Sequence, residues 1–179
     1  PVIYYISPQV WASRAGRVKT IKEYITKMIV IFKFEEEFYK KYGINADFVG
    51  HPLLDIVSPS MEKKEFLNSL GFSETQTTIA LLPGSRRQEI RNILPLMLKA
   101  SILIAKQKGT QFVIAKPVQA DWDIYDSQIK NLNLKLKIVE GKTYDCLEAS
   151  DFALVASGTA TLETAIMQKP FLVIYKMGL

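Results

Sequence analysis

Residues 78–89 read Thr-Ile-Ala-Leu-Leu-Pro-Gly-Ser-Arg-Arg-Gln-Glu, and the architecture can be worked out from this stretch. It opens with a short, mostly apolar run, and such a run bounded by turn residues is typical of a buried strand. Pro83 and Gly84 break the run, and a helical pattern follows from Ile90. A buried strand that turns directly into a helix is the repeating unit of an α/β sheet.

The same alternation continues toward the end of the chain. It predicts strands at 78–82, 111–115, 134–139, 152–155 and 171–174, and helices at 61–70, 90–108, 122–131, 144–149 and 160–168. Continuously apolar strands separated by helices indicate a parallel sheet covered on both faces. We therefore expect an α/β fold with a doubly wound parallel sheet.

A smaller version of this pattern precedes it. Strands are predicted at 2–6, 28–31 and 48–49, with helices at 18–27 and 34–42. Turn-forming residues then concentrate between Gly50 and Ser60, a composition typical of a linker. We expect residues 1–50 to be the C-terminal part of one Rossmann-like domain, 51–60 a linker, and 61–179 most of a second such domain.

Ligands of doubly wound sheets bind at the carboxyl ends of the strands, where the strand order reverses. If the second sheet has the common order 3-2-1-4-5, strand 78–82 lies beside strand 152–155. The loops that follow these two strands then flank one crevice.

The first of these loops carries the features of an anion site. Ser85 and Gln88 fit a capping box at a helix start. Gly84 allows a ligand to approach the backbone, the helix start offers free amides, and Arg86 offers a planar fork for phosphate oxygens. The alternative is a capped turn with a solvated arginine.

The second loop also has small and hydroxyl residues at a helix start, namely Ser157, Gly158 and Thr159. Glu163 lies four residues after Thr159, on the same helix face, where its carboxylate can accept from two sugar hydroxyls. Taken alone, Glu163 is better explained as a complement to the helix dipole. Two such loops at one crevice favour a nucleotide site.

Composition limits the remaining choices. Lys and Arg total 23 against 18 Asp and Glu, and the net charge of +5 suits phosphates or anionic lipid without requiring nucleic acid. The lone Cys146 and lone His51 exclude a Cys/His zinc site. No apolar run approaches the roughly eighteen residues of a membrane span. The chain starts at Pro1 with no signal-peptide pattern, which favours a piece of a longer protein.

Basic residues gather between Trp11 and Lys27, among them Arg14 and Arg17. They are suited to anionic lipid or a phosphorylated substrate, and a plain solvated face is the alternative.

Four motifs then occur in order: Ser7-Pro8-Gln9-Val10-Trp11-Ala12, Phe48-Val49-Gly50-His51-Pro52, Leu81-Leu82-Pro83-Gly84-Ser85-Arg86, and Ala156-Ser157-Gly158-Thr159-Ala160-Thr161-Leu162-Glu163. In this combination the chain resembles the lipid-A-disaccharide synthase family along essentially its whole length. The resemblance implies a two-domain GT-B glycosyltransferase of Gram-negative bacteria, peripheral at the cytoplasmic face of the inner membrane.

The resemblance also implies a reaction. 2,3-Diacylglucosamine would pass from UDP to the 6-hydroxyl of 2,3-diacylglucosamine 1-phosphate (lipid X), with inversion and release of UDP. The donor UDP-2,3-diacylglucosamine, the lipid X acceptor and the inner-membrane surface are the implied partners. No cofactor, metal or nucleic acid is implied.

Roles carry over to matching positions. Arg86, with Gly84 and Ser85, would hold the donor diphosphate and stabilise the leaving group. Ser157, Gly158 and Thr159 would donate further to phosphate, and Glu163 would bind the ribose. We expect the uracil near the backbone of Gly141 and Lys142. Trp11, Arg14 and Arg17 would face the acceptor or the membrane, and residues 1–50 would belong to the acceptor domain.

Two departures from the family pattern qualify these expectations. The family's catalytic carboxylate belongs before Pro1, and more of the nucleotide pocket follows Leu179, so we expect the isolated chain to be inactive and to bind UDP weakly at most. Ser13 stands where family members often carry an aromatic residue, which leaves the role of the Arg14 loop open.

Three alternatives remain at this point. One is a peptidoglycan-type N-acetylglucosaminyltransferase. Another is a UDP-N-acetylglucosamine 2-epimerase, whose second loop would resemble Ser-Gly-Gly-x-x-Glu-Glu rather than residues 157–163 here. The third is an inert nucleotide-binding remnant.

Overall fold

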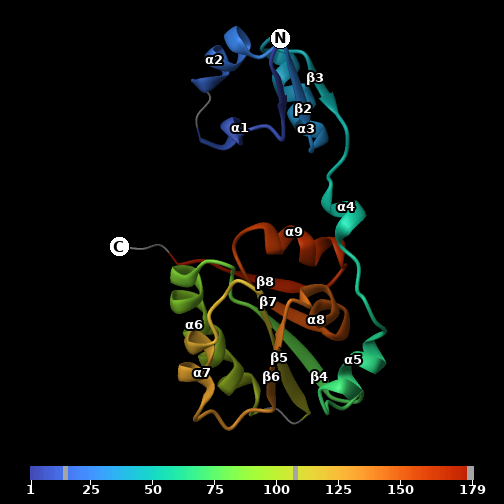
Figure 1. Cartoon of the computed structure of the whole chain (residues 1–179), viewed down its shortest axis with the longest axis vertical. Helices are drawn as coiled ribbons and strands as arrows, with labels where there is room; N and C mark the ends of the chain where they lie inside the picture. Colours follow the sequence, from blue (N-terminus) through green and yellow to red (C-terminus); the bar gives the residue numbers. More distant parts are fainter. Residues whose placement is uncertain (14–15, 107–108, 177–179) are drawn as a thin grey trace. The chain divides into compact units, whose positions relative to one another are not determined.

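The chain is described by a computed structural model, which covers residues 1–13, 16–106 and 109–176. It divides into two compact units, residues 1–56 and 57–179. The division lies within the breaker-rich segment, which contains a short helix, α4 (Leu53–Ile56) (Figure 1). Each unit is described below by itself.

The first unit contains, in its described residues, a parallel three-stranded sheet in the order β1-β2-β3. The strands are β1 (Ile3–Tyr5), β2 (Lys27–Val30) and β3 (Ala46–Phe48). The helices besides α4 are α1 (Val10–Ser13), α2 (Arg17–Tyr24) and α3 (Lys33–Lys41). Their buried side chains form one core, in which Met28, Val30 and Tyr39 are fully enclosed.

The helix predicted at 18–27 ends earlier than expected. It stops at Tyr24, since Ile25 is already extended and residue 27 begins β2. Thr26 accepts a hydrogen bond from the Val2 amide through its hydroxyl (3.1 Å). A β-branched pair before a strand thus favours the extended form over another helical turn.

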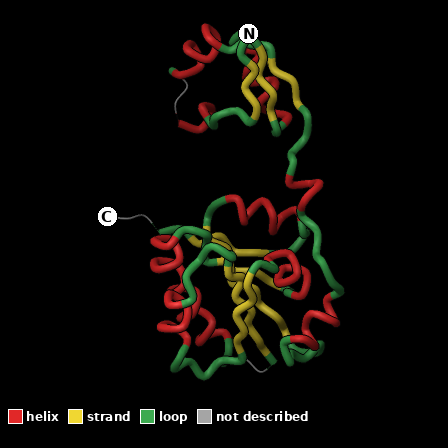
Figure 2. The backbone as a smooth tube through the Cα atoms, viewed as in Figure 1, coloured by secondary structure: helices red, strands yellow, loops and turns green. Residues whose placement is uncertain are grey.

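The second unit is built on a sheet that has, within the described ranges, five parallel strands in the order β6-β5-β4-β7-β8. The strands are β4 (Thr77–Leu82), β5 (Thr110–Lys116), β6 (Leu136–Glu140), β7 (Phe152–Ala156) and β8 (Phe171–Ile174). Counted along this domain the order is 3-2-1-4-5, so the expected topology is confirmed. Figure 2 shows the strands of this unit, in yellow, lying between its helices, in red.

Helices cover both faces of this sheet. They are α5 (Lys63–Ser69), α6 (Arg87–Ile104), α7 (Asp123–Ile129), α8 (Thr143–Ala149) and α9 (Thr159–Ile166). Alternate strand residues point to opposite faces, so Ile79 and Leu81 share a core with α6 and α7, whereas Ala80 and Leu82 share one with α5 and α8. This arrangement confirms the doubly wound α/β fold (Figure 1).

One helix boundary again differs. The helix predicted at 90–108 runs from Arg87 to Ile104, and residues 107 and 108 lie outside the described part of the chain.

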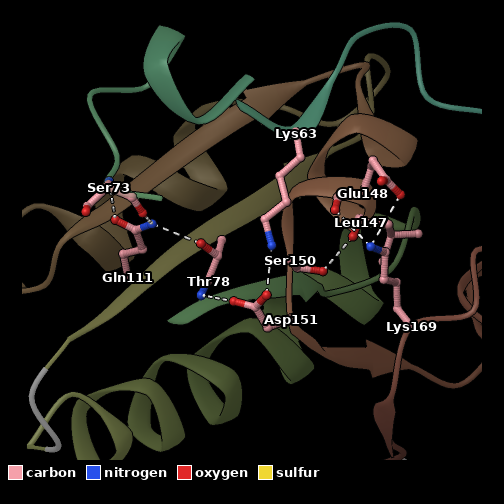
Figure 3. Close-up of polar contacts among 9 residues, drawn as sticks. All are labelled: Lys63, Ser73, Thr78, Gln111, Leu147, Glu148, Ser150, Asp151 and Lys169. Atoms are coloured by element: carbon pink, nitrogen blue, oxygen red, sulfur yellow. Dashed lines mark hydrogen bonds and ion pairs between the residues drawn. The ribbon is translucent and has the colours of Figure 1, made fainter. Parts of the chain in front are cut away.

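Polar side chains close the amino edge of the sheet (Figure 3). The buried Gln111 side chain donates to the Ser73 carbonyl (2.7 Å) and the Thr78 hydroxyl (2.9 Å), and it accepts from the Ser73 amide (3.0 Å). Asp151 accepts from the Thr78 amide (2.9 Å) and from Lys63 (2.8 Å). These bonds connect the segment before β4 to β5, and they connect the segment before β7 to both β4 and the helix at Lys63.

Candidate functional site

The loops after β4 and β7 open at the same edge of the sheet, because these strands are adjacent and Leu82 pairs in register with Val155. Residues of both loops line one cavity of about 390 Å³. Seven of the candidate residues are in its lining, namely Gly84, Ser85, Arg86, Ser157, Gly158, Thr159 and Glu163. The structure thus brings together the two loops that the sequence singled out.

The first loop does not have the capping box expected of Ser85 and Gln88. Arg86 is the N-cap residue of α6, and its cap has no side-chain hydrogen bond. Instead, the Glu89 carboxylate accepts from the Ser85 amide (3.1 Å). The prediction was wrong because the helix begins at Arg87, which puts Glu89 rather than Gln88 at the third helical position.

Glycine is favoured at position 84 by the backbone conformation, and the flexible Glu89 side chain lies against it. The φ of Gly84 is +105°, a conformation that side chains disfavour, and a Cβ at this position would collide with the Glu89 carboxyl group. Glu89 also lines the cavity. Its charge opposes an anion in the cavity, so Arg86 and the helix amides must outweigh it for phosphate to bind.

Arg86 is exposed and lines this cavity. Among the hydrogen bonds and ion pairs between described residues, none engages its guanidinium. Its neighbour Arg87, by contrast, pairs with Asp121 (2.7 Å). Arg86 therefore keeps its fork of donors available for a ligand.

The second loop leads from β7 into α9. The Ser157 amide donates to the Ile174 carbonyl (2.9 Å), which anchors the loop to β8. Gly158 is the N-cap residue of α9, and Ser157, Gly158 and Thr159 are all exposed. The first amides of a helix have no partner within it, so this start is suited to phosphate oxygens.

Glu163 follows one turn later on α9 and is partly buried. Its Oε1 accepts from the Tyr144 hydroxyl of α8 (2.9 Å). Burial, then the bond to Glu163, raises the pKa of Tyr144 to about 12, so the phenol keeps its proton and remains a donor. The bond fixes one carboxylate oxygen, and no bond between described residues engages the other, which is available for a ligand hydroxyl.

A second cavity, of about 480 Å³, adjoins the first through Glu163 and Thr143, which line both. Gly141 and Lys142, expected near a base, line it. Gly141 has a φ of +70°, so this position favours glycine. The buried Asp145 carboxylate accepts from the Ser60 amide (2.6 Å) and hydroxyl (2.9 Å), which holds the incoming segment against this cavity.

The remaining candidates belong to the first unit. Trp11 is exposed, and its indole N–H donates to the buried Glu35 carboxylate (3.3 Å). Arg17 is the exposed first residue of α2, and Lys19 and Lys22 are exposed on the same helix. Arg14 lies outside the described residues.

Sequence reasoning missed Glu89 and Tyr144. Glu89 had a local signal, as the acid in the first turn of α6. Tyr144 had none, since its partner Glu163 is nineteen residues away on another helix.

Comparison with known proteins identifies the family of this chain. The family model for lipid-A-disaccharide synthetase matches residues 1–179. The chain belongs to the lipid-A-disaccharide synthetase family.

Curated relatives agree with this assignment. The lipid-A-disaccharide synthase of Syntrophus aciditrophicus (strain SB) is 46% identical over 99% of the chain, which covers 47% of that protein. The synthase of the same name from Myxococcus xanthus (strain DK1622) is 42% identical over 100% of the chain and 47% of its own length. This synthetase-family chain therefore spans about half the length of the relatives it matches, and their names place the family among the enzymes of lipid A biosynthesis.

A solved glycosyltransferase from Rickettsia africae ESF-5 has a similar fold, with a TM-score of 0.58 and 13% identity over 96% of the chain and 50% of that protein. The parallel α/β architecture of this synthetase-family chain is thus consistent with part of a GT-B fold. Of the helices formed by its described residues, none has the length and apolar character needed to cross a membrane.

Proposed function

We propose that the second unit of this chain binds the UDP part of the donor in a glycosyltransferase that joins two acylated glucosamines into the lipid A disaccharide. In this reaction 2,3-diacylglucosamine passes from UDP to the 6-hydroxyl of 2,3-diacylglucosamine 1-phosphate, with inversion at the anomeric carbon. The observation that carries the proposal is that Arg86 and Glu163, from loops far apart in the sequence, line one cavity at the carboxyl edge of the sheet.

The diphosphate is assigned to the first cavity. Arg86 supplies a bidentate guanidinium, and the starts of α6 and α9 supply backbone amides near Ser85 and Thr159. Glu163 accepts from the ribose hydroxyls while Tyr144 holds its other oxygen. The uracil lies in the adjoining cavity beside Gly141.

These groups suit the charge that develops during transfer. Breaking the anomeric bond leaves negative charge on UDP, and donors placed beforehand around that charge stabilise the transition state more than the ground state. The chain's own positive groups can serve this purpose, so no step is assigned to a metal.

The first unit is assigned to the acceptor side. Its exposed Trp11, Arg17, Lys19 and Lys22 combine an aromatic ring with positive charge, which suits an acylated sugar phosphate at an anionic membrane surface. The proposed location is the cytoplasmic face of the inner membrane.

Mass spectrometry tests the proposal. A full-length protein containing this chain, given UDP-2,3-diacylglucosamine and 2,3-diacylglucosamine 1-phosphate, should form the disaccharide and UDP in equal amounts. The 179-residue chain alone should form none and should bind UDP weakly in calorimetry. An isomerised donor without disaccharide would contradict the proposal and support an epimerase.

A further inference from the structure

Lys116 is a buried lysine to which the proposed function gives no role. It is the last residue of β5, and its side chain is only 1% exposed. Burying an ammonium is unfavourable unless it is paired and hydrogen-bonded. A lysine at the ligand-binding edge of the sheet therefore needs an explanation.

The Lys116 ammonium has three kinds of partner. It donates to the Glu140 carboxylate at the end of β6 (2.7 Å) and to the Pro117 carbonyl (3.2 Å). It also lies over the Trp122 ring, 4.8 Å from the centroid, just before α7. One side chain thus connects β5, the loop after it, the end of β6 and the start of α7.

The backbone of Lys116 adds a further connection. Its carbonyl accepts from the Gly141 amide (2.9 Å), while Glu140, the preceding residue, pairs with Lys116 in register. The turn at Gly141 is therefore held twice, by the main chain and by the ion pair. Only the ion pair depends on the identity of the side chain.

The segments that Lys116 holds are the walls of the two cavities. Pro117 lines the first, Gly141 and Lys142 line the second, and Thr143 lines both. Lys116 itself is not part of either lining in the described structure. Lys116 can therefore affect ligand binding only by positioning these neighbouring residues.

We propose that Lys116 is a positioning residue for the nucleoside half of the ligand. Its bond to Glu140 sets the Gly141 turn, and that turn forms the wall against which the base lies. The inference rests on the proposed function, because it takes the second cavity as the site of the base. It separates the two parts of the ligand: the diphosphate depends on Arg86, and the nucleoside depends also on Lys116.

Calorimetry of a full-length protein containing this chain, with UDP and with inorganic pyrophosphate, tests this separation. Lys116→Met should weaken UDP binding by about tenfold, by analogy with the lower end of what losing the partner that orients a metal ligand costs in metal sites. Pyrophosphate affinity should not change. A general loss of stability would weaken the binding of both ligands alike, so the ratio of UDP affinity to pyrophosphate affinity is the decisive readout.

Lys63→Met is the matched control. Lys63 also pairs with a carboxylate, that of Asp151 (2.8 Å), but at the amino edge of the sheet. This variant should leave the affinity ratio at its wild-type value. A ratio that falls equally in both lysine variants would overturn the proposal.

Two further measurements cover a Lys116→Met protein that does not fold. Glu140→Ala removes the same bond from the partner, which is 37% exposed and more tolerant of truncation. It should lower the ratio in the same direction. In the wild-type protein, the nuclear magnetic resonance signal of the Gly141 amide should shift when UDP is added and should not shift when pyrophosphate is added. The absence of a shift with UDP would refute the proposal.

Failure of the two proposals is distinguishable. If the wild-type protein binds UDP no more tightly than pyrophosphate, the assignment of UDP itself is contradicted. If the wild-type protein prefers UDP, and the Lys116→Met and Glu140→Ala variants keep the same preference, only the role of Lys116 is contradicted.

Discussion

The two edges of the larger sheet use polar side chains in opposite ways. At the amino edge, Gln111 and Asp151 bond to neighbouring segments and are satisfied within the protein (Figure 3). At the carboxyl edge, Arg86, Ser157 and Thr159 are exposed beside a cavity. Satisfied groups stabilise the fold, whereas donors left open beside a cavity are available to a ligand. Substitutions at the two edges should therefore have different consequences.

Glu163 combines both behaviours. Tyr144 fixes one carboxylate oxygen, as at the amino edge, and the residue still lines both cavities. A binding group is thus oriented by the protein without being fully used by it. Such preorganisation reduces the entropy lost when a ligand binds.

The largest expected effect is at Arg86. Arg86→Ala in a full-length protein containing this chain should lower kcat by about 10² to 10³, by analogy with lost oxyanion donors. The unfolding midpoint should not move, because no described residue depends on this side chain. Arg91→Ala, an exposed arginine on the same helix, is the control and should retain normal turnover. Near-normal kcat in Arg86→Ala would remove the contrast between the edges.

A medium effect is expected at Gln111. Gln111→Ala removes the partner of the Ser73 amide and of the Thr78 hydroxyl and leaves the Ser73 carbonyl with only the Gln76 amide (3.4 Å), so the free energy of unfolding should fall by about 1 to 3 kcal/mol. Urea denaturation measures this loss, and UDP affinity should be unchanged in the folded variant. Ser157→Ala should behave in the opposite way, with unchanged stability and weaker UDP binding. The comparison fails if both variants lose the same property.

The smallest effect is expected at Asp151 and depends on pH. Burial opposes its ionisation, but the bonds from Lys63 and from the Thr78 amide outweigh burial and hold the pKa below its usual value of 3.8. Because the folded pKa is depressed, the ion pair stabilises the protein above pH 3.8, and this contribution is lost as the pH falls through the folded value.

Asp151→Asn tests this pH dependence. The carboxylate is partly exposed, so its loss should cost less than about 1 kcal/mol at neutral pH. Urea denaturation of both proteins at neutral and acidic pH should show the difference shrinking in acid. A difference that is constant across this range would show that charge plays no part at the amino edge.

The fold was predictable because its signals are local and repeated. Each buried strand is a short apolar run, and the common strand order placed strand 78–82 beside strand 152–155, as the pairing of Leu82 with Val155 confirms. The meeting of the two loops followed from that order. Element ends were less predictable, as at Tyr24 and Arg87, since they depend on single hydrogen bonds.

The contacts within the site were not predictable from the sequence. Tyr144 and Glu163 are nineteen residues apart, and Lys116 and Glu140 are twenty-four apart, so no helical or strand period connects them. Such pairs are set by which elements become neighbours in the fold. Glu89 differs, because its bond to the Ser85 amide is local; its carboxyl group takes the space beside Gly84 that sequence reasoning left for a ligand.

The pairing of β4 with β7 also has a kinetic consequence. The two loops of the cavity are separated along the chain by the whole of β5, β6 and their helices, yet their strands are neighbours in the sheet. Pairings between such distant segments form slowly, because closing the long intervening loop costs entropy before the contacts are gained. The ability to bind UDP should thus be among the last properties to appear as the nascent chain matures, and it makes a natural reporter for the end of folding.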